Sequence, residues 1–396
     1  MEGLCKNSCV ECAFKKACGS CSICEASVCK RNCSSCSVVC FKRPKTIAYF
    51  NSIGGPIAEL KPNESINLPV HIPVLPDRFK TIPKYNQIKI IGVHAGNMFS
   101  RNGEKINNSY TREGYAAALN LDRRTKAVLE FYVKDKTLEG FWDKRKSIYP
   151  VLKGLDFSAV IAPNYSVYED APRVDHMYNI KRSMIVYNEL LESGIPAVPD
   201  VSWYNKSDLD RWCGEINKNN IKVIAFSFQV VDVGLKTTNI WRSYISGFRY
   251  LCRNIRSDVK IIVAGLVSPF RVLEIFKATC GQSLHILNQS AYVQSRRGML
   301  SEVRMQDSCL SFDEIFERNI AYFNRIYEDI CQGYQNNGIL TNILQWDKEM
   351  LKQFYVDYTD CSNSLFMENK YGIEKSKLDL ALSIVIRQLR KKKIHI

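Results

Sequence analysis

The sequence has no long hydrophobic run and no export signal in its opening residues. Its mean hydropathy is −0.20, and no apolar stretch approaches the roughly 18–20 residues that a membrane-spanning helix needs. The first residues, MEGLCKNSCVECAF, contain no basic segment followed by an apolar one, which a secretory signal peptide requires. We therefore expect a cytoplasmic protein with no membrane partner.

The sequence also lacks the motifs of several common enzyme classes. No G-x-G-x-x-G follows a predicted strand and no phosphate-binding P-loop occurs, which argues against a Rossmann fold or a nucleoside triphosphatase. There are only five histidines, and no His/Cys/Asp grouping of the kind that marks a hydrolase triad. The sequence therefore gives no sign of a triad hydrolase.

What is present is an ordinary globular composition with an excess of positive charge. The chain has 396 residues, 46% of them hydrophobic, enough for a full core in two or three domains or one large α/β barrel. Lysine and arginine number 55 against 40 acidic residues, which gives a net charge of +15. This balance favours nucleic acid or a nucleotide as partner. The alternative is a lysine-rich proteome and no such partner.

Cysteine is concentrated near the N-terminus. Ten of the 16 cysteines fall within the first 40 residues, where there is no histidine, so a metal bound there would have thiolate ligands only. The spacing C-x2-C recurs four times, and this short gap lets two sulfurs converge on one metal. The predicted metal ligands are Cys5, Cys9, Cys12, Cys18, Cys21, Cys24, Cys29, Cys33, Cys36 and Cys40.

Three kinds of site compete for these thiols. Iron–sulfur chemistry fits best, with up to two [4Fe–4S] clusters, because the run C-x2-C-x2-C-x4-C from Cys18 approximates a bacterial ferredoxin run. It departs from that run by x4 in place of x3 and by lacking the following proline. Zinc is the alternative metal, although zinc sites usually pair two cysteine knuckles across a longer spacer. Disulfides would need an oxidising compartment, which nothing here indicates.

The spacing C-x3-C-x2-C occurs twice, over residues 5–12 and 29–36, and resembles the cluster motif of radical S-adenosylmethionine enzymes. In that family three cysteines leave one iron open for the cofactor, and an aromatic residue usually precedes the last cysteine. Here Glu11 and Ser35 occupy that place, and both copies precede every predicted strand. The resemblance implies a redox or radical enzyme as a second hypothesis.

Four regions follow from the pattern along the chain. Residues 1–42 form the cysteine-rich metal module, and residues 43–86, which are rich in proline, are predicted to be an irregular connection. Residues 87–305 alternate short β-branched runs with amphipathic helices, which is typical of a parallel sheet buried on both faces. Residues 306–396 are predicted to be a helical C-terminal region.

Seven or eight strand–helix units indicate an α/β fold, a (β/α)8-like barrel that is complete or irregular, with a doubly wound sheet as the alternative. An eighth strand is predicted at residues 46–50, ahead of the others in the sequence. The other predicted strands span residues 88–93, 127–133, 158–162, 196–201, 222–228, 260–264 and 284–287.

In such a barrel, functional residues gather where the strands end. These ends are rich in amides, hydroxyls and aromatic rings, which can read or stack on a base or sugar, and in arginines, which can hold phosphate. We predict Asp200 and Asp232 as acid/base residues; the alternative for either is an ordinary cap or backbone contact. The predicted ligand-binding residues are Asn164, Tyr165, Arg173, Trp203, Gln229, Asn288, Arg296 and Arg297.

Three blocks carry a resemblance to a known family. They are LDFSAVIAPNYSVYEDAPR at 155–173, YNIKRS at 178–183 and GIPAVPDVSW at 194–203. Over about residues 139–232, extending toward 300, they resemble a domain-of-unknown-function family common in Gram-positive bacteria, phages and plasmids. The resemblance implies a phage or mobile-element setting and supplies no activity.

A weaker resemblance concerns the last strands. The segment from His285 to Gly298, with Ser-Arg-Arg-Gly at its end, is similar to the end of the tRNA-guanine transglycosylase barrel. That family's acidic motif is replaced here by Leu-Asn-Gln at 287–289, and the zinc motif that normally follows is absent. The resemblance supports a barrel but argues against base exchange.

Together these features predict a barrel protein that contains a metal cluster and that binds nucleic acid or a nucleotide-like ligand, or acts on it. The predicted activity is base modification or glycosyl transfer. The alternatives are the redox enzyme described above and a non-enzymatic, basic nucleic-acid-binding or adaptor protein. The fold does not choose among these three, because one fold can serve many functions.

Overall fold

A computed structural model describes most of the chain beyond the cysteine-rich segment. The described residues are 49–50, 52–55, 59–77, 79, 88–167, 173–229, 239–266, 268–302, 305–307, 309–333, 346–360, 364–371, 373 and 378–391.

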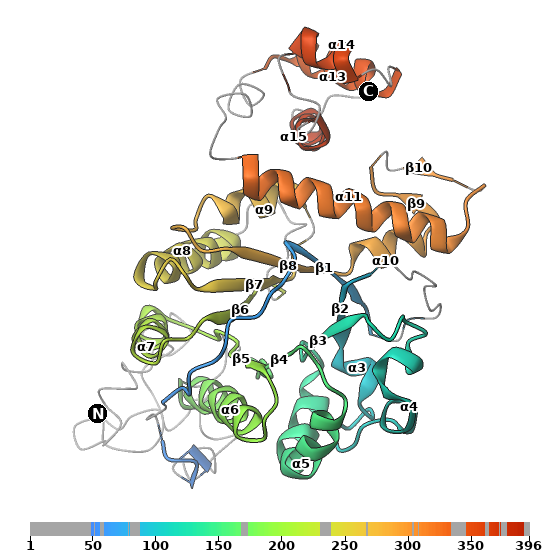
Figure 1. Cartoon of the computed structure of the whole chain (residues 1–396). Helices are drawn as coiled ribbons and strands as arrows, with labels where there is room; N and C mark the ends of the chain where they lie inside the picture. Colours follow the sequence, from blue (N-terminus) through green and yellow to red (C-terminus); the bar gives the residue numbers. More distant parts are fainter. Residues whose placement is uncertain are drawn as a thin grey trace, which may run out of the picture.

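Eight of the described strands run parallel and form a nearly closed barrel at the centre of the molecule (Figure 1). Neighbours follow the order β5-β4-β3-β2-β1-β8-β7-β6, so all carboxyl ends meet at one end of the barrel. The predicted (β/α)8-like class is confirmed. The strands are β1 (His71–Leu75), β2 (Ile90–His94), β3 (Lys126–Glu130), β4 (Ala159–Ile161), β5 (Ala197–Val198), β6 (Val223–Ser227), β7 (Lys260–Ala264) and β8 (Leu284–Asn288).

Helices surround this barrel and connect its strands (Figure 1). Helices α3 (Ala95–Met98) and α4 (Asn108–Ala118) join β2 to β3, and one helix lies in each of the next five connections. After β8 the chain forms α10 (Ser290–Ser295), a short antiparallel pair and α11 (Phe312–Gly333), which packs against α10 and β1. The five connecting helices are α5 (Asp135–Gly154), α6 (Arg173–Glu192), α7 (Lys206–Lys218), α8 (Asn239–Asn254) and α9 (Pro269–Phe276).

The helical C-terminal part lies beyond α11 (Figure 1). It contains α13 (Lys348–Asp360), α14 (Ser364–Tyr371) and α15 (Leu378–Lys391), and α15 packs against α11 and α9. Within the described ranges, no helix combines the length and apolarity needed to cross a bilayer.

Side-chain alternation fills the inside of the barrel. One face of each strand contributes a branched or small residue to a separate interior cluster, for example Ile72, Val128, Val198 and Ala225. The opposite face packs against the helices in the larger core. Since successive side chains of a strand point to opposite faces, this pattern fixes which residues reach the barrel mouth.

The prediction for the first strand was wrong. Tyr49 and Phe50 are helical, whereas the first strand is β1, which lies inside the region expected to be an irregular connection. Its sequence HIPVL is short and contains Pro73, and a proline within a run normally argues against a strand. Pairing with β2 begins only at Val74, so pairing with β8 and β2 together, rather than local sequence, defines this strand.

The barrel closes between β5 and β6 through two contacts. At the carboxyl end, Asp200 and Ala225 form a parallel bridge, in which the Val201 N–H donates to the Ala225 carbonyl at 2.9 Å. At the amino end, the buried side chain of Asn63 donates to the Ala197 carbonyl of β5 at 3.3 Å and to the Val223 carbonyl of β6 at 2.8 Å. It also accepts from the Lys222 N–H at 2.7 Å. Asn63 thus replaces strand pairing where the two strands separate.

Removal of the Asn63 side chain should open this junction. We expect Asn63→Ala to lower the free energy of unfolding by about 2–3 kcal/mol, because it leaves buried backbone groups without partners. Asn188 is the matched control, since its side chain bonds the same segment at exposed sites, to the Lys61 N–H and the Glu59 carbonyl. Urea unfolding should show a loss of less than about 1 kcal/mol for Asn188→Ala. Equal losses in the two variants would contradict this role of Asn63.

Candidate functional site

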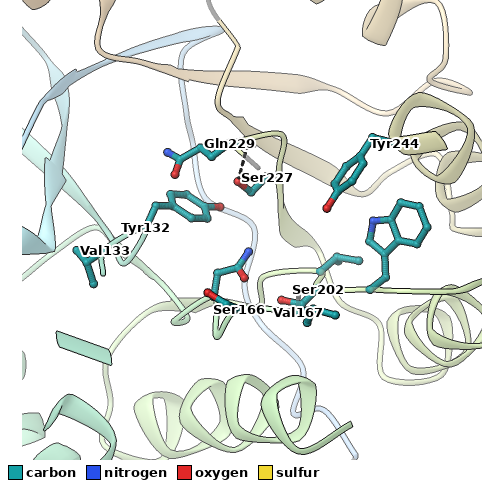
Figure 2. A pocket seen from close by; sticks show the side chains of 11 residues that line it. Tyr132, Val133, Ser166, Val167, Ser202, Ser227, Gln229 and Tyr244 are labelled. Carbon is teal, nitrogen blue, oxygen red and sulfur yellow. Dashed lines mark hydrogen bonds between the residues drawn. The ribbon is translucent and has the colours of Figure 1, made fainter. Parts of the chain in front are cut away.

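A pocket of about 150 Å³ opens among the carboxyl ends of β3, β4, β5 and β6 (Figure 2). This is the end of a barrel at which ligands bind. All the described side chains that line it are uncharged, so it suits a neutral group. They are Tyr132, Val133, Asn164, Ser166, Val167, Val201, Ser202, Trp203, Ser227, Gln229 and Tyr244.

Aromatic rings form one side of the pocket. Trp203 follows β5 and packs on Tyr244 of α8, with ring centroids 5.4 Å apart. Gly247, one turn along α8, allows this approach, because a Cβ there would lie 2.4 Å from the indole ring. The Tyr132 and Tyr244 side chains point toward one another across the pocket (Figure 2).

A buried carboxylate lies behind the pocket wall. The Asp200 side chain has no exposed surface, and it points into the barrel like Val198 two residues earlier. The Tyr132 hydroxyl donates to its Oδ1 at 2.9 Å, and the Ser202 hydroxyl is 3.5 Å from its Oδ2. Both partners line the pocket, so Asp200 reaches the pocket only through its neighbours.

Burial changes the acidity of this carboxyl group. Desolvation raises the pKa of Asp200 to about 7, against the lowering effect of hydrogen bonds from Tyr132, Ser202 and Asn164. A side chain with a pKa near neutrality can give or take a proton under ordinary conditions.

A second buried carboxylate holds the backbone of Tyr132. Glu130, also directed into the barrel, accepts the Tyr132 N–H at 2.7 Å through Oε2. The His94 Nε2 lies 3.0 Å from the Tyr132 carbonyl oxygen and 3.8 Å from Glu130 Oε1. Burial raises the pKa of Glu130, although His94 and the Tyr132 N–H act in the opposite direction. These contacts fix the position of Tyr132.

Three predicted ligand-binding residues come together in the pocket. Asn164 follows β4, Trp203 follows β5 and Gln229 follows β6, and all three belong to its lining. The predicted Asp200 is directly behind them. Their role in binding a ligand stays a prediction.

Two other predicted residues point elsewhere. Tyr165 is buried on the helix side, under the guanidinium of Arg182 at 4.0 Å. Asn288 also faces the helices, since its neighbour Leu287 faces the barrel interior, and it donates to the Tyr327 hydroxyl at 2.5 Å. Both belong to the packing between barrel and helices, which corrects their placement at the pocket.

None of the remaining predicted residues is among the described residues that line the pocket. Arg296 and Arg297 are exposed at the end of α10. Arg173 is the first residue of α6, and its side chain is outside the described part. Asp232 and the ten N-terminal cysteines lie outside the described residues. Within the described residues, no three His, Cys, Asp or Glu side chains are grouped to hold a metal ion.

Sequence reasoning missed two tyrosines of the site. Tyr132 could have been found by alternation, because Val128, Glu130 and Tyr132 share the inward face of β3 and its extension. Tyr244 lies in the middle of α8, and only the folded arrangement brings it to the pocket.

The fold and the pocket define a (β/α)8-like barrel protein with a ligand-sized site at the carboxyl ends of its strands. Residues 105–272 match the family described as Domain of unknown function (DUF4417). This stretch runs from ahead of α4 into α9 and includes every residue that lines the pocket. No curated protein matches the chain.

The pKa of Asp200 predicts a pH-dependent stability. Because the folded-state pKa lies above the unfolded value, stability falls as pH rises from about 4 to about 7. Asp200→Asn removes this dependence, so the variant should gain about 4 kcal/mol relative to the wild type between pH 4 and pH 8. Urea unfolding at several pH values measures the difference.

Asp258→Asn is the matched control for this prediction. The pKa of the exposed Asp258 is lowered, first by a hydrogen bond from Lys222. The wild type should therefore be the more stable of this pair at neutral pH, with the difference vanishing in acid. A parallel pH trend for the Asp200 and Asp258 variants would contradict the assignment.

Proposed function

We propose that the barrel binds one neutral ring of a nucleotide-like ligand, a base or a sugar, and modifies it at the carboxyl-end pocket. The observation that carries this proposal is the size and lining of the pocket. A void of about 150 Å³ accommodates a ligand the size of benzene, so a single six-membered ring matches it better than a whole nucleotide.

The lining supplies the contacts that a heterocycle needs. Trp203 and Tyr244 offer faces for stacking, which every base accepts. The amides of Asn164 and Gln229 offer a donor and an acceptor each, as an edge of a base requires. The Trp203 indole N–H is buried without a hydrogen-bond partner among the described residues, and a ligand acceptor would satisfy it.

Phosphate would lie outside this pocket, because no cation occurs among the described residues of its lining. The net charge of +15 supports a polynucleotide as the molecule that carries the ring. Exposed arginines such as Arg296 and Arg297, together with Arg173, stay the proposed phosphate contacts. Base modification or glycosyl transfer within a phage or plasmid setting is the corresponding activity.

The cysteine-rich segment is proposed to hold up to two [4Fe–4S] clusters, with zinc as the alternative. The support is the C-x2-C spacing and the ferredoxin-like run from Cys18. Such clusters would either stabilise the fold of the segment or transfer electrons. A structural role fits the nucleotide-binding proposal, whereas electron transfer fits a redox enzyme.

Ligand binding can be tested by calorimetry with uridine, cytidine and adenosine. We expect the pyrimidine nucleosides to bind more tightly than adenosine, because one ring fits the pocket. Trp203→Ala should weaken binding roughly tenfold through loss of stacking, and Gln229→Ala roughly threefold through loss of one hydrogen bond.

Two controls accompany this test. Arg297→Ala changes an exposed arginine outside the pocket wall and should leave nucleoside affinity unchanged. Trp203→Phe should retain part of the affinity, because it keeps a ring face. No binding of any of the three nucleosides, or wild-type affinity in Trp203→Ala, would refute the pocket proposal.

Metal content can be tested by anaerobic purification followed by iron, zinc and sulfide analysis. We expect roughly eight iron and eight sulfide per chain, with absorbance near 400 nm. Substitution of Cys21 by serine should lower the iron content, whereas Cys213→Ser, which changes a buried single cysteine of α7, should not. Two or three zinc ions without colour would replace the cluster proposal by structural zinc.

A further inference from the structure

We infer that Tyr132 is the residue that exchanges a proton with the bound ring, and that Asp200 stores this proton behind the pocket wall. The inference rests on the proposed function, because it names the reacting groups of the same pocket. Its geometric basis is the position of the Tyr132 side chain, which lines the pocket and whose hydroxyl donates to the Asp200 carboxylate at 2.9 Å.

Asp200 cannot contact a ligand itself. Its side chain has no exposed surface, and its partners Tyr132, Ser202 and Asn164 are all pocket-lining residues. The Tyr132 bond, at 2.9 Å, is shorter than the Ser202 contact of 3.5 Å. A hydroxyl can donate and accept at the same time, which the Asn164 amide nitrogen cannot do. Tyr132 is therefore the preferred route for a proton.

Two hydrogen bonds fix the position of the Tyr132 backbone. The Glu130 carboxylate accepts its N–H, and His94 Nε2 meets its carbonyl oxygen. His94 Nδ1 accepts the Gly96 N–H at 3.0 Å, so these two bonds assign the hydrogen to Nε2, which donates to Tyr132. Glu130 and His94 are thus positioning residues: they act on the ring only by fixing Tyr132.

The proton transfer balances without any other reactant. When Asp200 is ionised, Tyr132 donates to it, and the phenol oxygen can accept a hydrogen from an N–H or O–H of the ring. In the transfer, the ring gives its proton to Tyr132 while Tyr132 gives its own to Asp200. The products are a ring anion, an intact tyrosine and a protonated Asp200, and the reverse sequence protonates a ring.

Among the described residues, few charged groups face this series of hydrogen bonds. From β3, Glu130 acts on Tyr132, and both Glu130 and Asp200 raise the pKa of the Tyr132 hydroxyl, although burial is the largest cause. From β2, His94 faces Glu130, and Asp77, which follows β1, raises the pKa of Glu130 as well. Because the pKa of Tyr132 is raised, the tyrosine stays protonated while Asp200 titrates.

Uridine and cytidine form a matched pair of probes for this chain. Uridine presents an N–H at ring position 3, whereas cytidine presents an acceptor there. Above pH 7, Tyr132 donates to Asp200 and offers an acceptor to the pocket, which favours uridine. Below pH 7, protonated Asp200 donates to Tyr132, which then offers a donor and favours cytidine. We expect opposite affinity trends between pH 6 and pH 8, each of roughly threefold to tenfold.

Variants locate the origin of these trends. Asp200→Asn and Tyr132→Phe should each abolish the pH dependence for both probes, whereas Ser202→Ala should keep it. Trends that persist in Tyr132→Phe, or that have the same direction for both nucleosides, overturn the inference. A merely structural role for Tyr132 would lower both affinities at every pH and leave the trends in place.

An infrared measurement on the free protein separates this inference from the ligand proposal. The band of a protonated, buried carboxylic acid should titrate near pH 7 and disappear in Asp200→Asn. Tyr132→Phe should move the midpoint to higher pH, because the Tyr132 bond lowers the pKa of Asp200. Absence of the band, or a midpoint unchanged in Tyr132→Phe, overturns the inference even where nucleosides bind. The expected shift without nucleoside binding refutes only the ligand.

Discussion

Closure of the barrel between β5 and β6 is the constraint on which the site depends. The two strands meet through the backbone bridge at Asp200 and Ala225 and through the Asn63 side chain at the opposite end. Because Asp200 takes part in the bridge, its side chain is fixed on the inward face of the barrel. The residue that completes the barrel is therefore also the one to which we assign proton storage next to the pocket.

The position of Asp200 inside the barrel lowers the stability of the fold at neutral pH, and the same position is what the proposed proton transfer requires. A carboxylate inside the barrel is unfavourable when ionised, and its raised pKa measures that cost. Hydrogen bonds from Tyr132, Ser202 and Asn164 reduce the cost without removing it. An asparagine would close the barrel with less penalty at neutral pH, but it could not store a proton. A destabilised acid in this position is typical of a functional site.

The sequence predicted the barrel because its central strands are continuous apolar runs with helical stretches between them. The sequence also predicted that Asn164, Trp203 and Gln229 lie at the carboxyl end of the barrel, because each of them follows a predicted strand. It failed where the face of a strand matters, because one residue of shift turns a side chain from the interior to the helices, as for Asn288. The sequence also failed to predict β1. This strand contains a proline, which argues against a strand, and it is defined only by its pairing with β8 and β2.

Charge is divided between the pocket and the whole chain in a way that suits a polymeric ligand. The pocket lining is neutral, although the chain carries a net charge of +15. In nucleic-acid recognition, contacts to phosphate position the polymer, whereas contacts to the base select it. A neutral pocket discriminates between rings by stacking and hydrogen bonds, and its selectivity is little affected by salt. Under the proposed function, attraction by the basic chain would bring the polymer close and would weaken as salt rises. The family match covers the pocket, since every described residue that lines it lies within 105–272.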